Sequence, residues 1–159
     1  MSEGFRAEVF VPGRPRTKGS LKPVHIKGGA GRCRVSLTES GQYATEWKNE
    51  MIRAIRAQVG DLCIRNAFPV VVDTYFRFER LCKPDHAMPW PTRERGEFAH
   101  GDEDKLRRNA LDALTQSGLI LDDSLVVGGR IGKRWVRDGE SPGVRIIVSS
   151  VPDVDGWMP

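Results

Sequence analysis

The stretch that decides the fold is FPVVVDTYFRFER, residues 68–80. Every second position from residue 70 onward is apolar or a threonine, namely Val70, Val72, Thr74, Phe76 and Phe78. The polar residues Asp73, Arg77 and Glu79 fall on the opposite side of this pattern. Because successive side chains of a β-strand point to opposite faces of a sheet, a period of two predicts a strand with one buried face. We therefore expect a strand from Phe68 to Arg80.

The segment before this strand predicts two further strands and a helix. Phe5–Val11 alternates apolar and polar residues, and Pro12-Gly13 ends the alternation. A short second strand is expected over residues 34–37, followed by a helix over about residues 40–59. The helix is expected to bury the apolar residues that recur at helical spacing: Tyr43, Trp47, Met51, Ala54 and Ile55.

The segment after the strand predicts a long loop, a second helix and two more strands. Prolines forbid regular structure in the middle of residues 81–101. A helix is expected over Glu103–Ser117, where Gly118 stops it. Strands are expected over residues 124–135, with a bulge at Gly128-Gly129, and over residues 144–149. The order β-β-α-β-α-β-β predicts an α+β domain with a mixed sheet over residues 1–151 and a loose tail over 152–159.

Composition and charge indicate which partners and which cellular compartment to expect. The chain has 159 residues and a formal charge of +4, a basic excess that fits a nucleic-acid partner. No run approaches the about 18 apolar residues of a membrane span, and the N-terminus lacks the pattern of a secretory signal. The three cysteines are odd in number and far apart, which indicates free thiols rather than a disulfide framework. We expect a cytoplasmic protein without a membrane partner.

Basic residues gather between Pro12 and Thr38. The stretch contains no acidic residue and seven basic ones, namely Arg14, Arg16, Lys18, Lys22, Lys27, Arg32 and Arg34. It is also rich in glycine, so it favours a flexible basic loop or arm. Such a loop can be merely soluble, but the unrelieved positive charge favours contact with phosphates.

Acidic residues gather at the start of the second helix. Asp102 stands at the expected N-cap, where a carboxylate accepts backbone N–H bonds, and Asp104 lies in the first turn. On an ideal helix Asp104 and Arg108 are neighbours, so they form either a surface ion pair or a metal-binding carboxylate beside a phosphate-binding cation. The pattern alone leaves both interpretations open.

Two more carboxylates, Asp122 and Asp123, follow the second helix after a short linker. In an extended segment they point in opposite directions, so only one of them is expected to enter a shared site. Carboxylates about 4 Å apart repel each other and also repel DNA phosphates, unless a cation lies between them. Mg²⁺ prefers oxygen ligands and binds through one or two carboxylates together with phosphate, so it is the natural cation for such a cluster.

The segment Asp102–Asp123 resembles RusA-type Holliday-junction resolvases. The family pattern is D-x-D-N-L-x-K, a helix ending in L-D-A-L-x-x-x-G, then D-D before a strand. This chain reads DEDKLRR at residues 102–108, LDAL at 111–114, Gly118 and LDD at 121–123. Residues 11–16 also resemble the opening strand and basic loop of the family, and residues 40–43 resemble the start of its first helix.

The resemblance implies a small homodimeric, Mg²⁺-dependent endonuclease of phage type that cuts four-way DNA junctions in recombination and repair, with Mn²⁺ as a possible substitute. By position it implies metal ligands at Asp102, Asp104 and Asp123. The catalytic lysine of the family falls on Arg108 and its asparagine on Lys105, and both are departures. Arg108 keeps the charge but cannot deprotonate, so it fits transition-state charge stabilisation.

The DNA contacts expected from the sequence are Arg14, Arg16, Lys18, Lys22 and Lys105. Two alternatives stay open beside the junction resolvase. One is a non-catalytic protein that binds branched DNA and leaves the aspartates without a role. The other is a metal-dependent nuclease for flaps, forks or RNA. His25, His86 and His100 are expected to be surface or loop residues rather than ligands.

Overall fold

The core of the protein is a mixed five-stranded β-sheet. The computed structural model describes residues 5–18, 21–27, 33–39, 42–60, 68–80, 91 and 102–151. The strands of the main sheet are β1 (Arg6–Pro12), β4 (Val70–Phe78), β5 (Val126–Gly128), β6 (Ile131–Trp135) and β7 (Gly143–Ser150). The expected strands over residues 5–11, 68–80 and 144–149 are therefore confirmed, each within two residues at either end.

The sheet runs in the order β1-β7-β4-β5, and β6 also pairs with β4. β7 pairs antiparallel with both β1 and β4, whereas β5 and β6 run parallel to β4. The first strand along the chain is thus an edge strand, and β4 lies in the interior of the sheet. This arrangement confirms the predicted α+β class with a mixed sheet and two main helices.

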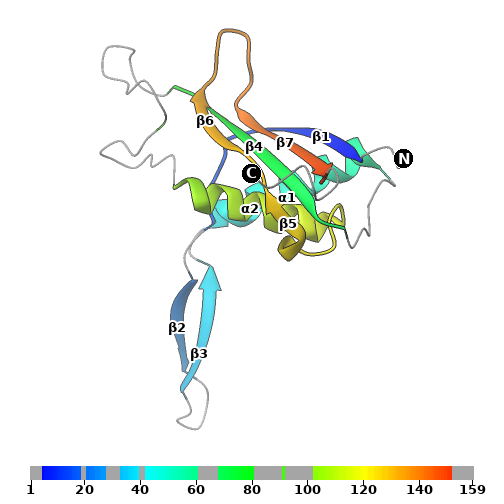
Figure 1. Cartoon of the computed structure of the whole chain (residues 1–159). Coiled ribbons are helices and arrows are strands. Elements are labelled where there is room, and N and C mark those ends of the chain that lie inside the picture. Colours follow the sequence, from blue (N-terminus) through cyan, green and yellow to red (C-terminus); the bar gives the residue numbers. More distant parts are fainter. Residues whose placement is uncertain are drawn as a thin grey trace.

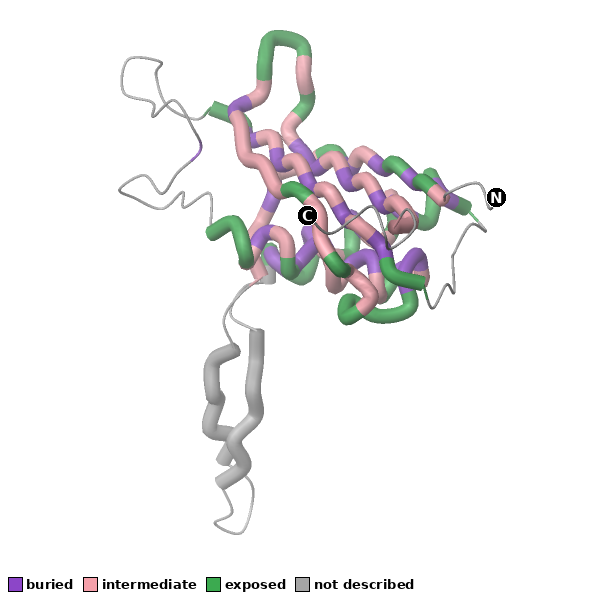
Figure 2. Tube along the Cα trace, in the orientation of Figure 1, coloured by how far each residue is buried: buried purple, intermediate pink, exposed green. Residues whose placement is uncertain are grey.

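Two helices, α1 (Gln42–Val59) and α2 (Glu103–Ser117), pack on the sheet (Figure 1). Along β4 buried residues alternate strictly with half-buried ones, as Figure 2 shows. The buried residues of β4 and β1 join the apolar faces of both helices in one core cluster. At helical spacing along α2, four residues form its buried side: Leu106, Ala110, Ala113 and Leu114.

A two-stranded hairpin, β2 (Leu21–Lys27) with β3 (Cys33–Glu39), replaces most of the expected flexible basic loop. The strands pair antiparallel from Leu21 with Glu39 to Lys27 with Cys33, so the expected strand over 34–37 is longer and has a partner that the sequence did not reveal. Figure 1 shows the hairpin extending away from the sheet and helices. The prediction of a loop was wrong here because the glycines fall outside both strands.

The buried face of α1 differs from the expected one at its first position. Trp47, Met51 and Ile55 are buried as predicted and Ala54 packs half-buried against the core, but Tyr43 is 65% exposed. The buried residue of the first turn is Ala44 instead. Tyr43 therefore belongs to the surface, at the end of α1 that lies nearest to the basic segment 14–18.

The last expected strand, over residues 124–135, divides into three parts. A short 3-10 helix, η3 (Asp123–Leu125), precedes β5, and the register against β4 shifts before β6 begins. The register irregularity lies between Val126 and Gly128, beside the expected position at Gly128-Gly129, and Gly129 itself has a φ of +134°. The Arg107 guanidinium donates to the carbonyl oxygens of Gly128 and Gly129. A side chain of α2 thus satisfies backbone acceptors where the hydrogen-bond ladder of the sheet is interrupted.

The expected loop over residues 81–101 and the expected tail over 152–159 lie outside the described residues, apart from Pro91, which is buried. No helix within the described ranges combines the length and the apolar character that crossing a membrane requires.

Replacing Gly129 by alanine is expected to destabilise the protein by about 3 kcal/mol or more, because left-handed strain and overpacking add. An added Cβ would lie 1.9 Å from the backbone oxygen of Val72. The matched control is Gly60→Ala, at a φ of +59° with nothing within 4 Å, which should cost only about 1 kcal/mol. Urea unfolding measures both. Equal losses in the two variants would contradict the close approach of Gly129 to the backbone of β4.

Candidate functional site

Asp102 begins α2 but does not cap it through its side chain. Its backbone is extended, with φ −71° and ψ 143°, and no side-chain hydrogen bond to the helix N-terminus forms. The Asp102 carboxylate instead pairs with Lys105 Nζ at 2.9 Å. Asp102 is 64% exposed and Lys105 is 42% exposed, so this ion pair contributes little to stability. A structural cap therefore does not explain this aspartate.

Asp104 and Arg108 both lie on the exposed side of α2. Four residues apart on a helix, their side chains are neighbours separated by only about 40° around the axis. Among the residues that the structure describes, neither takes part in an ion pair. The interpretation of this couple as a surface salt bridge is thus not supported, and both charged groups face solvent.

The basic segment Arg14–Lys18 is tied to α2 rather than free. The buried side chain of Asn109 donates from Nδ2 to the backbone oxygen of Arg16 at 3.0 Å and to that of Ala44 at 3.3 Å. The Lys18 amide donates to the Lys105 oxygen at 3.2 Å. Sequence reasoning missed Asn109, although an asparagine between Leu106 and Ala110 on an apolar helix face was a signal for a buried polar contact.

Lys18 differs in role from the other cations of this segment. Its Nζ lies 2.5 Å from Asp112 Oδ2, and the two side chains are 27% and 19% exposed. The ammonium group is therefore already neutralised by a partner on α2. Its expected phosphate contact gains no support from this geometry, and the side chain of Lys22 lies outside the described part of the chain.

Arg14 and Arg16 bring two positive charges together beside the start of α1. Burial lowers the pKa of Arg14, the charge of Arg16 lowers it further, and the nearby Glu79 opposes both effects. Repulsion between these guanidinium groups favours binding of an anion, because an anion between two cations relieves it. Both residues are half-buried, so their position is defined by packing.

Asp122 and Asp123 differ in what their side chains do. Hydrogen bonds from the Ser124 side chain and from its amide lower the pKa of Asp122. The amide lies 2.8 Å from Asp122 Oδ1, and this contact caps η3. Asp123 lies within η3 and is exposed. Asp122 thus has a local role in capping η3, and both aspartates are exposed. The choice of Asp123 over Asp122 remains a prediction of the family resemblance.

The carboxylate oxygens of the three aspartates suit Mg²⁺, but the three side chains do not lie together in one site. Within the described ranges, no three His, Cys, Asp or Glu side chains lie together so that they could hold a metal ion. Asp102 and Asp104 belong to the N-terminal turn of α2, whereas Asp123 follows the C-terminal end of that helix. This arrangement of a single chain therefore does not bring Asp123 to the other two.

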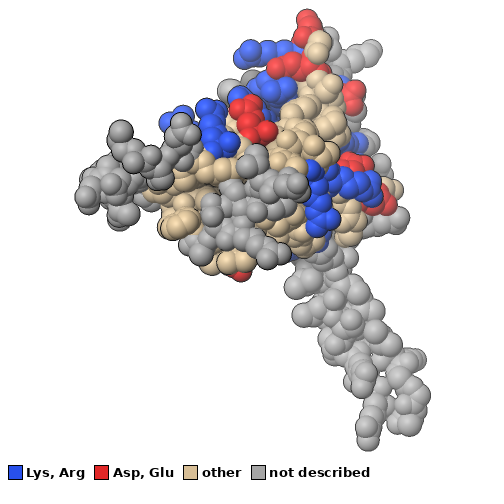
Figure 3. Space-filling model, turned by 90° about the vertical axis from the view of Figure 1, so that its right-hand side faces the viewer, with Lys and Arg blue, Asp and Glu red and all other residues tan. Residues whose placement is uncertain are grey.

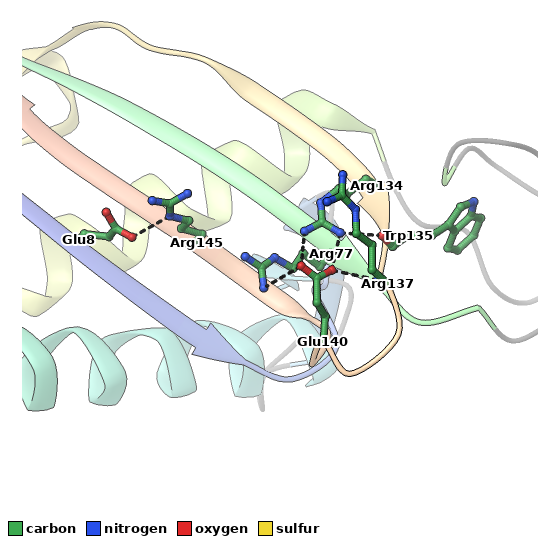
Figure 4. Close-up of polar contacts among 7 residues, drawn as sticks. All are labelled: Glu8, Arg77, Arg134, Trp135, Arg137, Glu140 and Arg145. Atoms are coloured by element: carbon green, nitrogen blue, oxygen red, sulfur yellow. Dashed lines mark hydrogen bonds and ion pairs between the residues drawn. The ribbon is translucent and has the colours of Figure 1, made fainter.

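A second group of charges lies at the end of β4, where the loop between β6 and β7 crosses it (Figure 4). The carboxylate of Glu140 accepts from both terminal nitrogens of Arg134, at 2.5 and 2.7 Å, and from the Arg137 amide at 2.9 Å. Arg77 lies 3.8 Å from it. These contacts hold the loop against the sheet, so we assign the group a structural role.

Charges of both signs also mix elsewhere on the surface. Glu8 accepts from Arg145 at 2.7 Å across the β1–β7 pair. Figure 3 shows a face on which Lys and Arg side chains are interleaved with Asp and Glu, rather than a continuous area of one sign. That face therefore lacks the uniform positive potential that attracts a polyanion.

No protein-family model matches the chain, and a search among curated proteins returns no match. The resemblance of residues 102–123 to RusA-type resolvases thus depends on the motif itself.

Replacing Glu140 by glutamine is expected to lower stability at pH 7 and to weaken the loss of stability in acid. Hydrogen bonds from Arg134 and from the Arg137 amide lower the pKa of Glu140 from its ordinary 4.5 to about 2. A carboxyl group with a lowered pKa stabilises the fold above its unfolded pKa, and this contribution disappears as the pH falls from about 4.5 to about 2.

Unfolding free energies measured between pH 7 and pH 2 test this expectation. The wild type should lose more stability than Glu140→Gln over the lower part of that range. Parallel curves for the two proteins would show that the Glu140 contacts do not stabilise the loop.

Proposed function

We propose that this chain is a divalent-metal-dependent endonuclease that cuts branched DNA, with the four-way junction as its principal substrate. The proposal includes Mg²⁺ as the cofactor, with Mn²⁺ as a substitute, and a homodimer that presents two sites to one junction. It also places the protein in the cytoplasm, where its free cysteines stay reduced. Recombination and repair of DNA are the processes that such an activity serves.

The observation that carries the proposal is the exposed couple of Asp104 and Arg108 beside an anchored basic segment. A carboxylate and a guanidinium that are neighbours without an ion pair retain their capacity to bind other charged groups. Arg16 is held close to the same helix through Asn109, and the charge of Arg14 lies near that of Arg16. DNA phosphates supply the negative charge that this arrangement lacks, and cations at such positions fix the register of the backbone.

Each residue of the couple has a distinct proposed role. Arg108 binds the phosphate group with two parallel N–H bonds and stabilises its developing charge, a role that does not require deprotonation. Lys105 pairs with Asp102 in the absence of DNA, so it is available to exchange that partner for a phosphate oxygen. Asp102 and Asp104, at the start of α2, are the proposed metal ligands, and the family resemblance adds Asp123, which a single chain leaves beyond the other end of that helix. Mg²⁺ held by these carboxylates would supply Lewis-acid chemistry for phosphodiester hydrolysis.

A second candidate function is a protein that binds branched DNA without cutting it. The separation of Asp123 from the N-terminal turn of α2 favours this alternative, since no three-ligand group is present among the described residues. It keeps the same contacts for Arg14, Arg16 and Arg108. The two candidates therefore differ in cleavage and not in affinity.

Replacing Asp104 by asparagine is expected to reduce Mg²⁺-dependent cleavage of a synthetic four-way junction by at least about 100-fold. Loss of an outer partner of a metal ligand already costs about 10- to 100-fold, and loss of a ligand removes more. The matched control is Glu103→Gln, which changes the adjacent exposed acid in the same helical turn and should cut like the wild type. Product formation on denaturing gels measures all three proteins.

Comparison of junction, flap, fork and duplex substrates in the same assay decides the preferred DNA. Tight junction binding without cutting in Mg²⁺ or Mn²⁺ would establish the second candidate instead. Unchanged cutting by Asp104→Asn would overturn the assignment of the metal site.

A further inference from the structure

An exposed aromatic ring lies next to the anchored basic segment. Tyr43 is 65% exposed, although Trp47, one turn later on α1, is only 3% exposed. The helical spacing of apolar residues predicted that both rings are buried, so the exposure of Tyr43 departs from that pattern. Single exposed aromatic residues are common on protein surfaces, but an aromatic side chain beside a cation has the two groups on which nucleic-acid bases stack.

The guanidinium of Arg16 lies over this ring. Its central carbon is 5.2 Å from the ring centroid of Tyr43, within the about 6 Å of a cation–π contact. The pair offers two flat groups, one aromatic and one cationic. Nucleic-acid bases stack on both kinds of group, and the cation also binds the phosphate that follows the base.

One buried side chain holds both members of this pair. Asn109 is 2% exposed, and its Nδ2 donates to the backbone oxygen of Arg16 itself and to that of Ala44, the residue after Tyr43. The amide therefore connects α2 to the segment that carries the cation and to the turn that carries the ring. A surface that is positioned before the ligand arrives loses less conformational entropy on binding.

We propose that Arg16 and Tyr43 form a stacking platform for an unpaired base of DNA, held in place by Asn109. The inference rests on the proposed function for the identity of its ligand, and it adds a base subsite to the phosphate contacts already described. Continuous base stacking is interrupted where strands exchange in branched DNA, so unpairing a base there costs less than in a uniform duplex, and the platform gives the protein a means to prefer branch points. Stacking does not read the base sequence, because every base has a flat face.

Replacing Tyr43 by alanine is expected to weaken binding of a gapped DNA by about 5- to 140-fold, the range that loss of one base–aromatic stack gives. The gap carries 2-aminopurine, whose fluorescence falls when the base stacks. The full-length protein is titrated in EDTA, so that binding is measured without cleavage. Affinity for a fully paired duplex of the same length should change little, and Tyr43→Trp should retain both the affinity and the quenching.

The matched control is Phe68→Ala, because Phe68 is 67% exposed and lies on another element of the fold. This variant should bind gapped DNA and quench like the wild type. Equal affinity and quenching in Tyr43→Ala and wild type, or an equal loss in Phe68→Ala, would overturn the platform. If the wild type binds and cuts junctions while Tyr43→Ala does so equally well, the inference fails and the proposed function stands. If the wild type binds neither the gapped DNA nor the four-way junction, both the inference and the proposed function fail.

Discussion

The surface proposed to bind DNA depends on the buried amide of Asn109. Its two hydrogen bonds join α2 to the segment before the hairpin and to the first turn of α1, which lie 93 and 65 residues away in the chain. Leaving this buried amide without partners would lower the free energy of unfolding by about 1–3 kcal/mol. The hydrogen bonds of Asn109 and the apolar core around it therefore favour the same arrangement. Arg16 and Tyr43 take their places on the surface as a consequence.

The two faces of α2 have different roles. Its inner face packs Leu106, Ala110 and Leu114 into the core, and Arg107 donates hydrogen bonds to the backbone oxygens where β5 ends. Its outer face leaves Asp104 and Arg108 in solvent. Because the inner face is fixed by packing and by hydrogen bonds, the outer charges are presented on a rigid element, as a site for phosphate chemistry requires.

The sequence predicted α2 with its observed bounds, since the acidic first turn and the left-handed Gly118 mark its two ends. The strand pattern of β4 was equally clear because a period of two is easily recognised. The β2–β3 hairpin escaped prediction because the glycine-rich setting suggested a loop. Asn109 and Tyr43 escaped because their roles come from contacts with distant segments, and no local pattern shows that an aromatic residue at helical spacing will face solvent.

Hydrogen exchange of the full-length protein with and without a four-way junction, in EDTA, tests the central claim that DNA binds the surface organised by Asn109. The account predicts slower exchange in residues 14–18, in the first turn of α1 and in the first two turns of α2, with no change in the C-terminal half of α1. Slower exchange confined to other segments of the chain, or no change in exchange at saturating DNA, would contradict this claim.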